Sequence, residues 1–197
     1  MAKNTQRCMG WGLLVLMTGA LGGELVSPDV AINGTTQERA QYVEMEVYCA
    51  SNPCRQNVHF KLRTDQGVMN QKAAVYWPVI QGEQISVLAG EAVKVAGQLQ
   101  GGVFKDWHMA PENGAGIVFK LTQNDDDNGM RLVIKNPHDF PIKVSIDMID
   151  LAGNLHPTSS CPVMAGGGVY EMWPHPIPEL LISNVRKAGE EAKTCEY

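Results

Sequence analysis

Histidine and methionine side chains occur in two places where their chemistry would suit a soft metal ion. His108 adjoins Met109, and Met172 lies three residues before His175. Imidazole nitrogens and thioether sulfurs are suitable ligands for copper in an exported protein. One hypothesis is therefore a periplasmic copper-binding protein that uses these four residues, although no His-x-His or His-x-x-His pair supports it.

The same two places carry tryptophans that could form a recognition surface for another protein. Trp107 precedes His108, and Trp173 opens the proline-rich stretch that contains His175. Exposed aromatic side chains beside prolines are typical of surfaces that dock a partner. The alternative, which we favour, is that both tryptophans close the ends of a β-fold while the prolines protect an edge strand.

Cysteine spacing predicts disulfides rather than a metal site. Five cysteines occur, at positions 8, 49, 54, 161 and 195, and loss of the first would leave an even number. We expect the pair Cys49–Cys54, which encloses a turn-forming sequence, and the pair Cys161–Cys195, which would tie down the C-terminal tail. Zinc is the alternative, but Cys161 and Cys195 have no second cysteine nearby and export favours oxidation.

Common catalytic and phosphate-binding motifs are missing from the sequence. It contains no G-x-S-x-G, H-E-x-x-H or S-x-x-K motif, no P-loop and no dinucleotide fingerprint. Residues 124–129 match the start of a calcium loop, but the twelfth position, which needs glutamate, is Lys135. We therefore interpret 124–129 as a solvated hairpin turn and expect a non-catalytic protein without a cofactor.

The N-terminal segment has the composition of a signal peptide. Two basic residues precede an apolar run from Cys8 to about Leu21, and the small residues Ala20 and Gly22 suit signal peptidase. We expect cleavage after about Gly22, which leaves no membrane span and a periplasmic or secreted protein. An uncleaved anchor is the alternative, although the apolar run is short and rich in glycine.

Net charge limits the partners that the protein would attract. The chain carries a formal charge of −5, and loss of the basic N-terminal segment would make it more negative. Because nucleic acids attract proteins mainly through basic side chains, we do not expect a nucleic-acid partner. We expect contact with an unidentified protein partner in the cell envelope instead.

Short β-branched and aromatic runs alternate with turn residues from position 41 onward. Alternation of apolar and polar residues predicts a hairpin of strands 41–49 and 57–63 across the Cys49–Cys54 turn. Further strands are expected at 73–80, 84–88, 91–99, 116–123, 130–136, 142–150, 168–173 and 179–185. The sequence offers no long amphipathic helix pattern, so it indicates an all-β protein.

Strands at this spacing, with proline turns and a late cysteine, resemble the general immunoglobulin-like sandwich. The resemblance implies an antiparallel β-sandwich of two layers and no particular activity. We therefore expect a signal peptide at 1–22, a linker or arm at 23–40, a disulfide-bearing β-sandwich domain at 41–188 and a tail at 189–197. The expected function is that of an exported, non-catalytic interaction protein.

Overall fold

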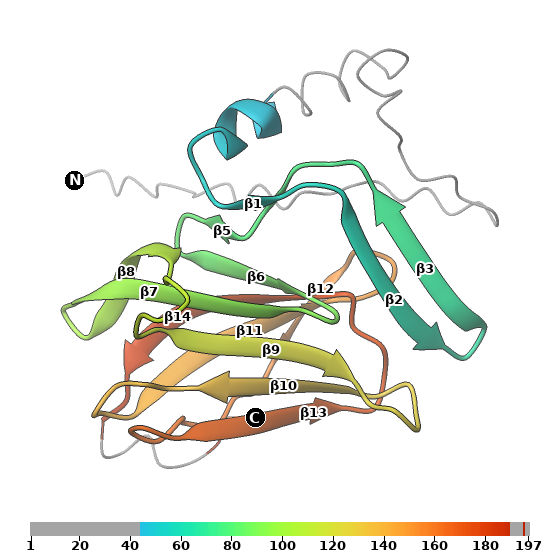
Figure 1. Ribbon diagram of the computed structural model, residues 1–197. Helices are drawn as coiled ribbons and strands as arrows, with labels where there is room; N and C mark the ends of the chain where they lie inside the picture. Colours follow the sequence, from blue (N-terminus) through green and yellow to red (C-terminus); the bar gives the residue numbers. More distant parts are fainter. Residues whose placement is uncertain (1–43, 190–194, 196–197) are drawn as a thin grey trace, which may run out of the picture.

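The computed structural model describes residues 44–189 and Cys195, which fold almost entirely into antiparallel β-strands (Figure 1). The predicted signal peptide and linker lie outside the described residues. The strands are β1 (Cys54–Arg55), β2 (Val58–Thr64), β3 (Gly67–Ala73), β4 (Trp77–Pro78), β5 (Ile80–Gln81), β6 (Gln84–Leu88), β7 (Ala92–Gln100), β8 (Val103–Met109), β9 (Ile117–Gln123), β10 (Met130–Lys135), β11 (Ile142–Ile149), β12 (Leu155–Thr158), β13 (Gly168–Trp173) and β14 (Glu179–Lys187).

Ten of the described strands form two layers that are joined along one side, and β1 with β4 and β2 with β3 form two separate two-stranded sheets. The first layer has the order β8-β7-β9-β10-β13, and the second has the order β5-β6-β14-β11-β12. A single residue pair, Arg186 with Val103, connects β14 to β8 and so continues one layer into the other. In Figure 1, β9, β10 and β13 lie in front of β11 and β14. The predicted all-β, sandwich-like, disulfide-bearing fold is confirmed, whereas the immunoglobulin-like topology is not.

Alternation along each strand places one row of apolar side chains in the core. Phe119, Leu132 and Ile134 from the first layer are completely buried, as are Ile85 and Ile182 from the second. Successive side chains of a strand point to opposite faces, so the intervening residues of these strands face away from the core. Burial of a side chain of this size contributes about 1.5–3 kcal/mol, which makes this core the main source of stability.

The predicted hairpin of 41–49 with 57–63 is wrong. Residues 44–49 are helical, and β2 forms its hairpin with β3 instead. Met45, Tyr48 and Cys49 are the half-buried residues of the helical turn, at the i, i+3, i+4 spacing of one helix face. Met45 and Cys49 fit both the strand and the helical periodicity, whereas Val47 of the predicted strand is 69% exposed on the helical turn.

Both predicted disulfides are present. Cys49 is bonded to Cys54, next to the helical turn, and Cys161 is bonded to Cys195 in the C-terminal tail. The second disulfide ties the predicted tail to the segment that precedes β13. Stable disulfides of this kind indicate an oxidising, extracytoplasmic environment. Among the described residues, no helix is long and apolar enough to cross a membrane.

The connection between β10 and β11, which contains Pro137 and Pro141, crosses from one layer to the other. Asn136 organises this loop, because its side-chain amide donates to the carbonyl oxygens of Phe140, Val163 and Met164 at 2.8, 3.2 and 3.2 Å. Its side-chain oxygen also accepts the N–H of His138 at 3.0 Å. The buried side-chain amide of Asn136 thus supplies hydrogen bonds to a loop in which the two prolines have no backbone N–H to donate.

Candidate functional site

The two tryptophans proposed for a recognition surface pack within the fold. Trp107 is only 9% exposed and stacks on Phe104 with a centroid distance of 5.6 Å. Trp173 packs against the core, and its indole Nε1 donates to the hydroxyl of Thr158 at 3.1 Å. Neither tryptophan is therefore available as an exposed aromatic platform.

The structure does not bring the four candidate copper ligands together. His108 and Met109 lie on β8, Met172 lies on β13, and His175 lies in the loop that follows β13. Strands β7, β9 and β10 separate β8 from β13, which at about 4.8 Å per strand corresponds to roughly 19 Å. Since a metal ion contacts its ligands at about 2 Å, the geometry does not support a shared site.

The acidic 124–129 turn is filled by a guanidinium group. The side chain of Arg63 donates to the carbonyl oxygens of Asn124, Asp125 and Asp127. Hydrogen bonds from the side-chain amide of Asn124 and the backbone N–H of Gly129 hold the pKa of Asp127 below its usual range. The turn therefore fastens the β2–β3 hairpin to β9 and β10, and the side chains of Asn124 and Asp127 stabilise the turn itself.

The outer face of the first layer carries an unexpected concentration of positive charge. Lys94 on β7, Lys120 on β9, and Arg131 and Lys135 on β10 alternate with the buried residues of their strands. Val118 on β9 lies between Lys94 on β7 and Lys135 on β10, because it pairs with both. Lys120 pairs with Val133 on β10. Within β7, β9, β10 and β13, no outward position holds an aspartate or glutamate. We call these four basic residues and their intervening apolar neighbours the cationic face.

A shallow groove of about 560 Å³ lies on the cationic face. Its floor contains Val118 and Val133, and the side chains of Lys94, Lys135 and Tyr170 line it. The remaining lining comes from two glycine-containing segments, 114–116 and 166–168, and from Asn136, Pro137 and Val169. The groove therefore combines an apolar floor with positive charges.

Local packing holds one wall of the groove in place. The Nζ of Lys94 donates to the carbonyl oxygens of Pro111 and Glu112 at 3.3 and 2.8 Å, which fixes the neighbouring loop. Gly116 has no room for a side chain, since a Cβ atom there would lie 2.8 Å from the carbonyl oxygen of Val95. The loop can therefore approach β7 closely only with glycine at this position.

Two large apolar side chains extend the cationic face to its edge. Tyr170 and Met172 on β13 are 66% and 65% exposed. Tyr170 pairs with Val133 and Met172 pairs with Arg131, so both lie in the same rows as the basic residues. The surface can thus supply charge attraction and apolar contact to the same bound molecule.

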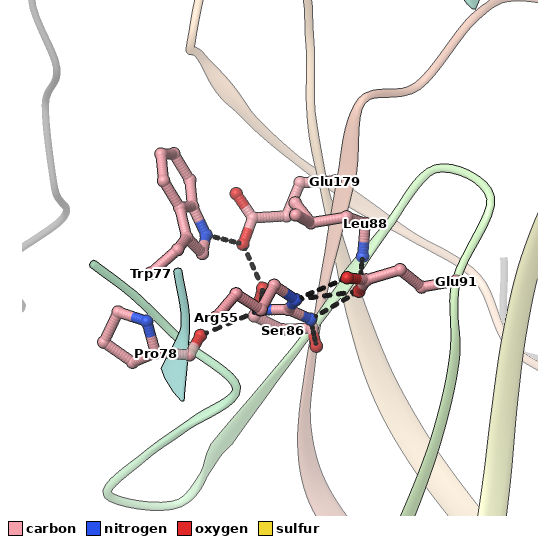
Figure 2. Close-up of polar contacts among 7 residues, drawn as sticks. All are labelled: Arg55, Trp77, Pro78, Ser86, Leu88, Glu91 and Glu179. Carbon is pink, nitrogen blue, oxygen red and sulfur yellow. Dashed lines mark hydrogen bonds and ion pairs between the residues drawn. The ribbon is translucent and has the colours of Figure 1, made fainter. Parts of the chain in front are cut away.

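A second polar cluster lies between the N-terminal strands and the second layer (Figure 2). The guanidinium Nε of Arg55 donates to both carboxylate oxygens of Glu91 at 2.7 and 2.9 Å. Its terminal nitrogens donate to the carbonyl oxygens of Pro78 and Ser86 at 3.1 and 2.8 Å. Glu179 lies beside this pair and accepts hydrogen bonds from the Trp77 indole at 3.0 Å and from the Ser86 hydroxyl.

The cluster around Arg55 is a structural clamp, which joins β1 and β4 to β6 and β14. Glu179 is only 4% exposed, and burial raises the pKa of its carboxyl above the ordinary value. The Ser86 hydroxyl is buried as well and already donates to Glu179, so it is not placed to attack a substrate. A set of polar groups that are buried and mutually hydrogen-bonded is typical of a packing device.

Among the described residues, no group of three or more histidine, cysteine, aspartate or glutamate side chains is arranged to hold a metal ion. Sequence reasoning missed the cationic face, because the alternation of basic and apolar residues is visible within each strand but the strand order that joins them is not. Comparison of the chain with protein-family models, with curated proteins and with solved structures found no match. The geometry of the cationic face therefore carries the functional argument.

Proposed function

We propose that this protein is a non-catalytic binding protein that holds an acidic segment of a partner protein on its cationic face. The observation that carries the proposal is the charge of this face. Four basic side chains occupy outward positions without an intervening carboxylate, in a chain whose formal net charge is −5. Such segregation of charge favours encounter with an oppositely charged partner and orients it before contact.

Apolar contact gives the proposed complex its strength. Val118 and Val133 form the groove floor, and Tyr170 and Met172 extend the apolar surface to the edge of the layer. Charge attraction between exposed groups is screened by salt, whereas the burial of an aromatic or thioether side chain is not. A segment that combines carboxylates with apolar side chains therefore fits this surface better than a purely acidic one.

The proposed place of action is the cell envelope or the outside of the cell. The N-terminal sequence has the pattern of a signal peptide, and the two disulfides are suited to an oxidising compartment. A periplasmic or secreted protein would meet its partner after export and oxidation. The edge strands and surface charges described above would then be formed before binding.

A synthetic peptide tests the proposal directly. The probe is a capped, fluorescein-labelled peptide of about eight residues that alternates glutamate and valine. We expect saturable binding in fluorescence anisotropy, with an affinity that falls as salt rises. An otherwise identical peptide with glutamine in place of glutamate should bind at least about tenfold more weakly, equivalent to about 1.4 kcal/mol.

Charge reversal on the protein supplies the matched comparison. The double variant Lys120→Glu/Lys135→Glu should weaken peptide binding about tenfold or more, because it replaces attraction with repulsion. Lys61→Glu/Lys72→Glu makes the same change of charge on the exposed β2–β3 hairpin and should bind nearly normally. Equal losses in the two variants would show that net charge alone governs binding and would contradict a specific face. No binding of the acidic peptide at low salt would overturn the proposal.

A further inference from the structure

Among the strands of residues 44–189, β13 is the edge strand of the first layer. It pairs with β10 from Met130–Trp173 to Lys135–Gly168, without a break in register. Among residues 44–189, no strand pairs with its other side. Alternate residues along this edge therefore have backbone N–H and C=O groups directed away from the layer.

This edge lacks the features that usually prevent strand addition. β12, the edge strand of the second layer, is four residues long and contains Pro157. In contrast, β13 has six residues, without proline, lysine or a bulge. Its only charged residue, Glu171, is half-buried and accepts the backbone N–H of Cys161 at 2.7 Å. The Glu171 carboxylate is therefore hydrogen-bonded within the protein and does not place an exposed charge at the edge that would oppose strand addition.

The side chains beside the edge match the chemistry of the proposed ligand. Lys135 pairs with Gly168, so no β13 side chain separates it from the space beside the edge. An added strand would lie about 10 Å from β10, a distance that a lysine and a glutamate side chain can span together. Tyr170 and Met172 would contact the outward side chains of that strand directly.

We infer that β13 is the docking edge, and that the acidic partner segment adds to it as an extended strand whose outward side chains include carboxylates. The inference rests on the proposed function and specifies how the segment binds. Backbone hydrogen bonds to β13 supply affinity, and Lys135, Arg131 and Tyr170 select the side chains. The occupant is thus defined by an extended conformation together with acidic and apolar residues.

Charge argues against a second copy of this chain as the occupant. Joining two β13 edges would leave the basic β10 rows of the two copies about 14 Å apart, because two β13 strands would lie between them. The outward positions of β13 hold no acidic side chain, so such a pair would gain no charge attraction. An acidic strand, about 10 Å from β10, supplies that attraction.

Amide hydrogen exchange tests strand addition separately from binding itself. The full chain, ¹⁵N-labelled and with its disulfides intact, is compared with and without the glutamate–valine peptide. At a peptide concentration of 100 times Kd, exchange of alternate β13 amides should slow by up to about 100-fold. Exchange at β12 should not change, because that strand lies at the edge of the other layer. In the Lys120→Glu/Lys135→Glu variant, the β13 amides should lose protection at the same peptide concentration.

Each outcome has a distinct meaning. Slowed exchange confined to β13 supports strand addition. Peptide binding without any change at β13 overturns strand addition but leaves the proposed binding function intact. Failure of the peptide to bind overturns both. A concentration-dependent dimer of the free protein with protected β13 amides, detected by light scattering and exchange, would identify a second copy as the occupant and overturn the inference.

Discussion

Replacing Arg55 with methionine should destabilise the protein by about 3 kcal/mol, because it removes the centre of the clamp drawn in Figure 2. The Arg55 side chain is 11% exposed, and that of its partner Glu91 is 33% exposed. Removing one member of a buried ion pair costs about 3–5 kcal/mol, because the other charge stays desolvated. The partial exposure of Glu91 places the expected cost at the lower end of that range.

The remaining hydrogen bonds of Arg55 support this magnitude. The carbonyl oxygens of Pro78 and Ser86 each lose a charged donor in Arg55→Met. Glu179 also loses a nearby positive charge that lowers the pKa of its carboxyl. Methionine retains most of the aliphatic packing, so the measured loss reports mainly on polar contacts.

Urea unfolding followed by circular dichroism measures the loss. With an m value of about 2 kcal/mol/M, a 3 kcal/mol loss lowers the unfolding midpoint by about 1.5 M urea. Arg131→Met is the matched control, since Arg131 is exposed on β10, and should change stability by no more than about 0.5 kcal/mol. A midpoint for Arg55→Met within about 0.3 M of the wild-type value would refute the clamp.

Three further predictions concern the same fold. Burial raises the pKa of Glu179 above its usual 4.5, so the folded state retains a proton that the unfolded state releases. The free energy of unfolding therefore falls as pH rises from about 4.5 to the pKa of Glu179 in the folded state. Glu179→Gln should therefore gain thermal stability relative to wild type as pH rises through that window, and a constant difference in Tm between about pH 4 and pH 8 would contradict this. Replacing Cys161 and Cys195 by serine should lower the free energy of unfolding in urea by about 4 kcal/mol, and replacing Cys49 and Cys54 should lower it by about 2 kcal/mol. The difference is expected because the first disulfide closes a loop of 34 residues and the second a loop of 5. Equal losses would argue against the loop-length explanation. Gly97→Ala should lower stability by about 1–3 kcal/mol in the same assay, because the added Cβ would lie 2.9 Å from the Lys105 carbonyl oxygen and 3.0 Å from Trp107; an unchanged midpoint would mean that β8 can move away.

Local patterns predicted most strands but not every element. The bounds expected for 84–88 and 168–173 agree with β6 and β13 because these runs end at glycine, proline or a polar turn. β8 was missed because its alternation is interrupted: Asp106 has a positive φ of 54°, opposite a bulge between Ala96 and Gln98. β3 was missed because Gly67, Asn70 and Gln71 weaken its strand pattern.

The cationic face could not be predicted because it depends on strand order. Lys94 and Lys135 lie 41 positions apart in the sequence, and only the pairing of β7 with β9 and of β9 with β10 places them on one surface. Residue composition likewise cannot show that β13 ends the layer. In contrast, both disulfide pairings were predictable. Cys49 and Cys54 are five residues apart across a turn, and pairing them leaves Cys161 to bond with Cys195 in the tail.

Strand β14, the last of the described strands, holds the second layer together. β14 contacts β11 along one side and β6 and β8 along the other, so it joins three strands that come earlier in the sequence. A chain that emerges from a ribosome or a translocation pore with its N-terminus first cannot complete the second layer until residues 179–187 are free. This layer therefore forms late, and premature termination before Glu179 would leave β6 and β11 with unpaired, aggregation-prone edges.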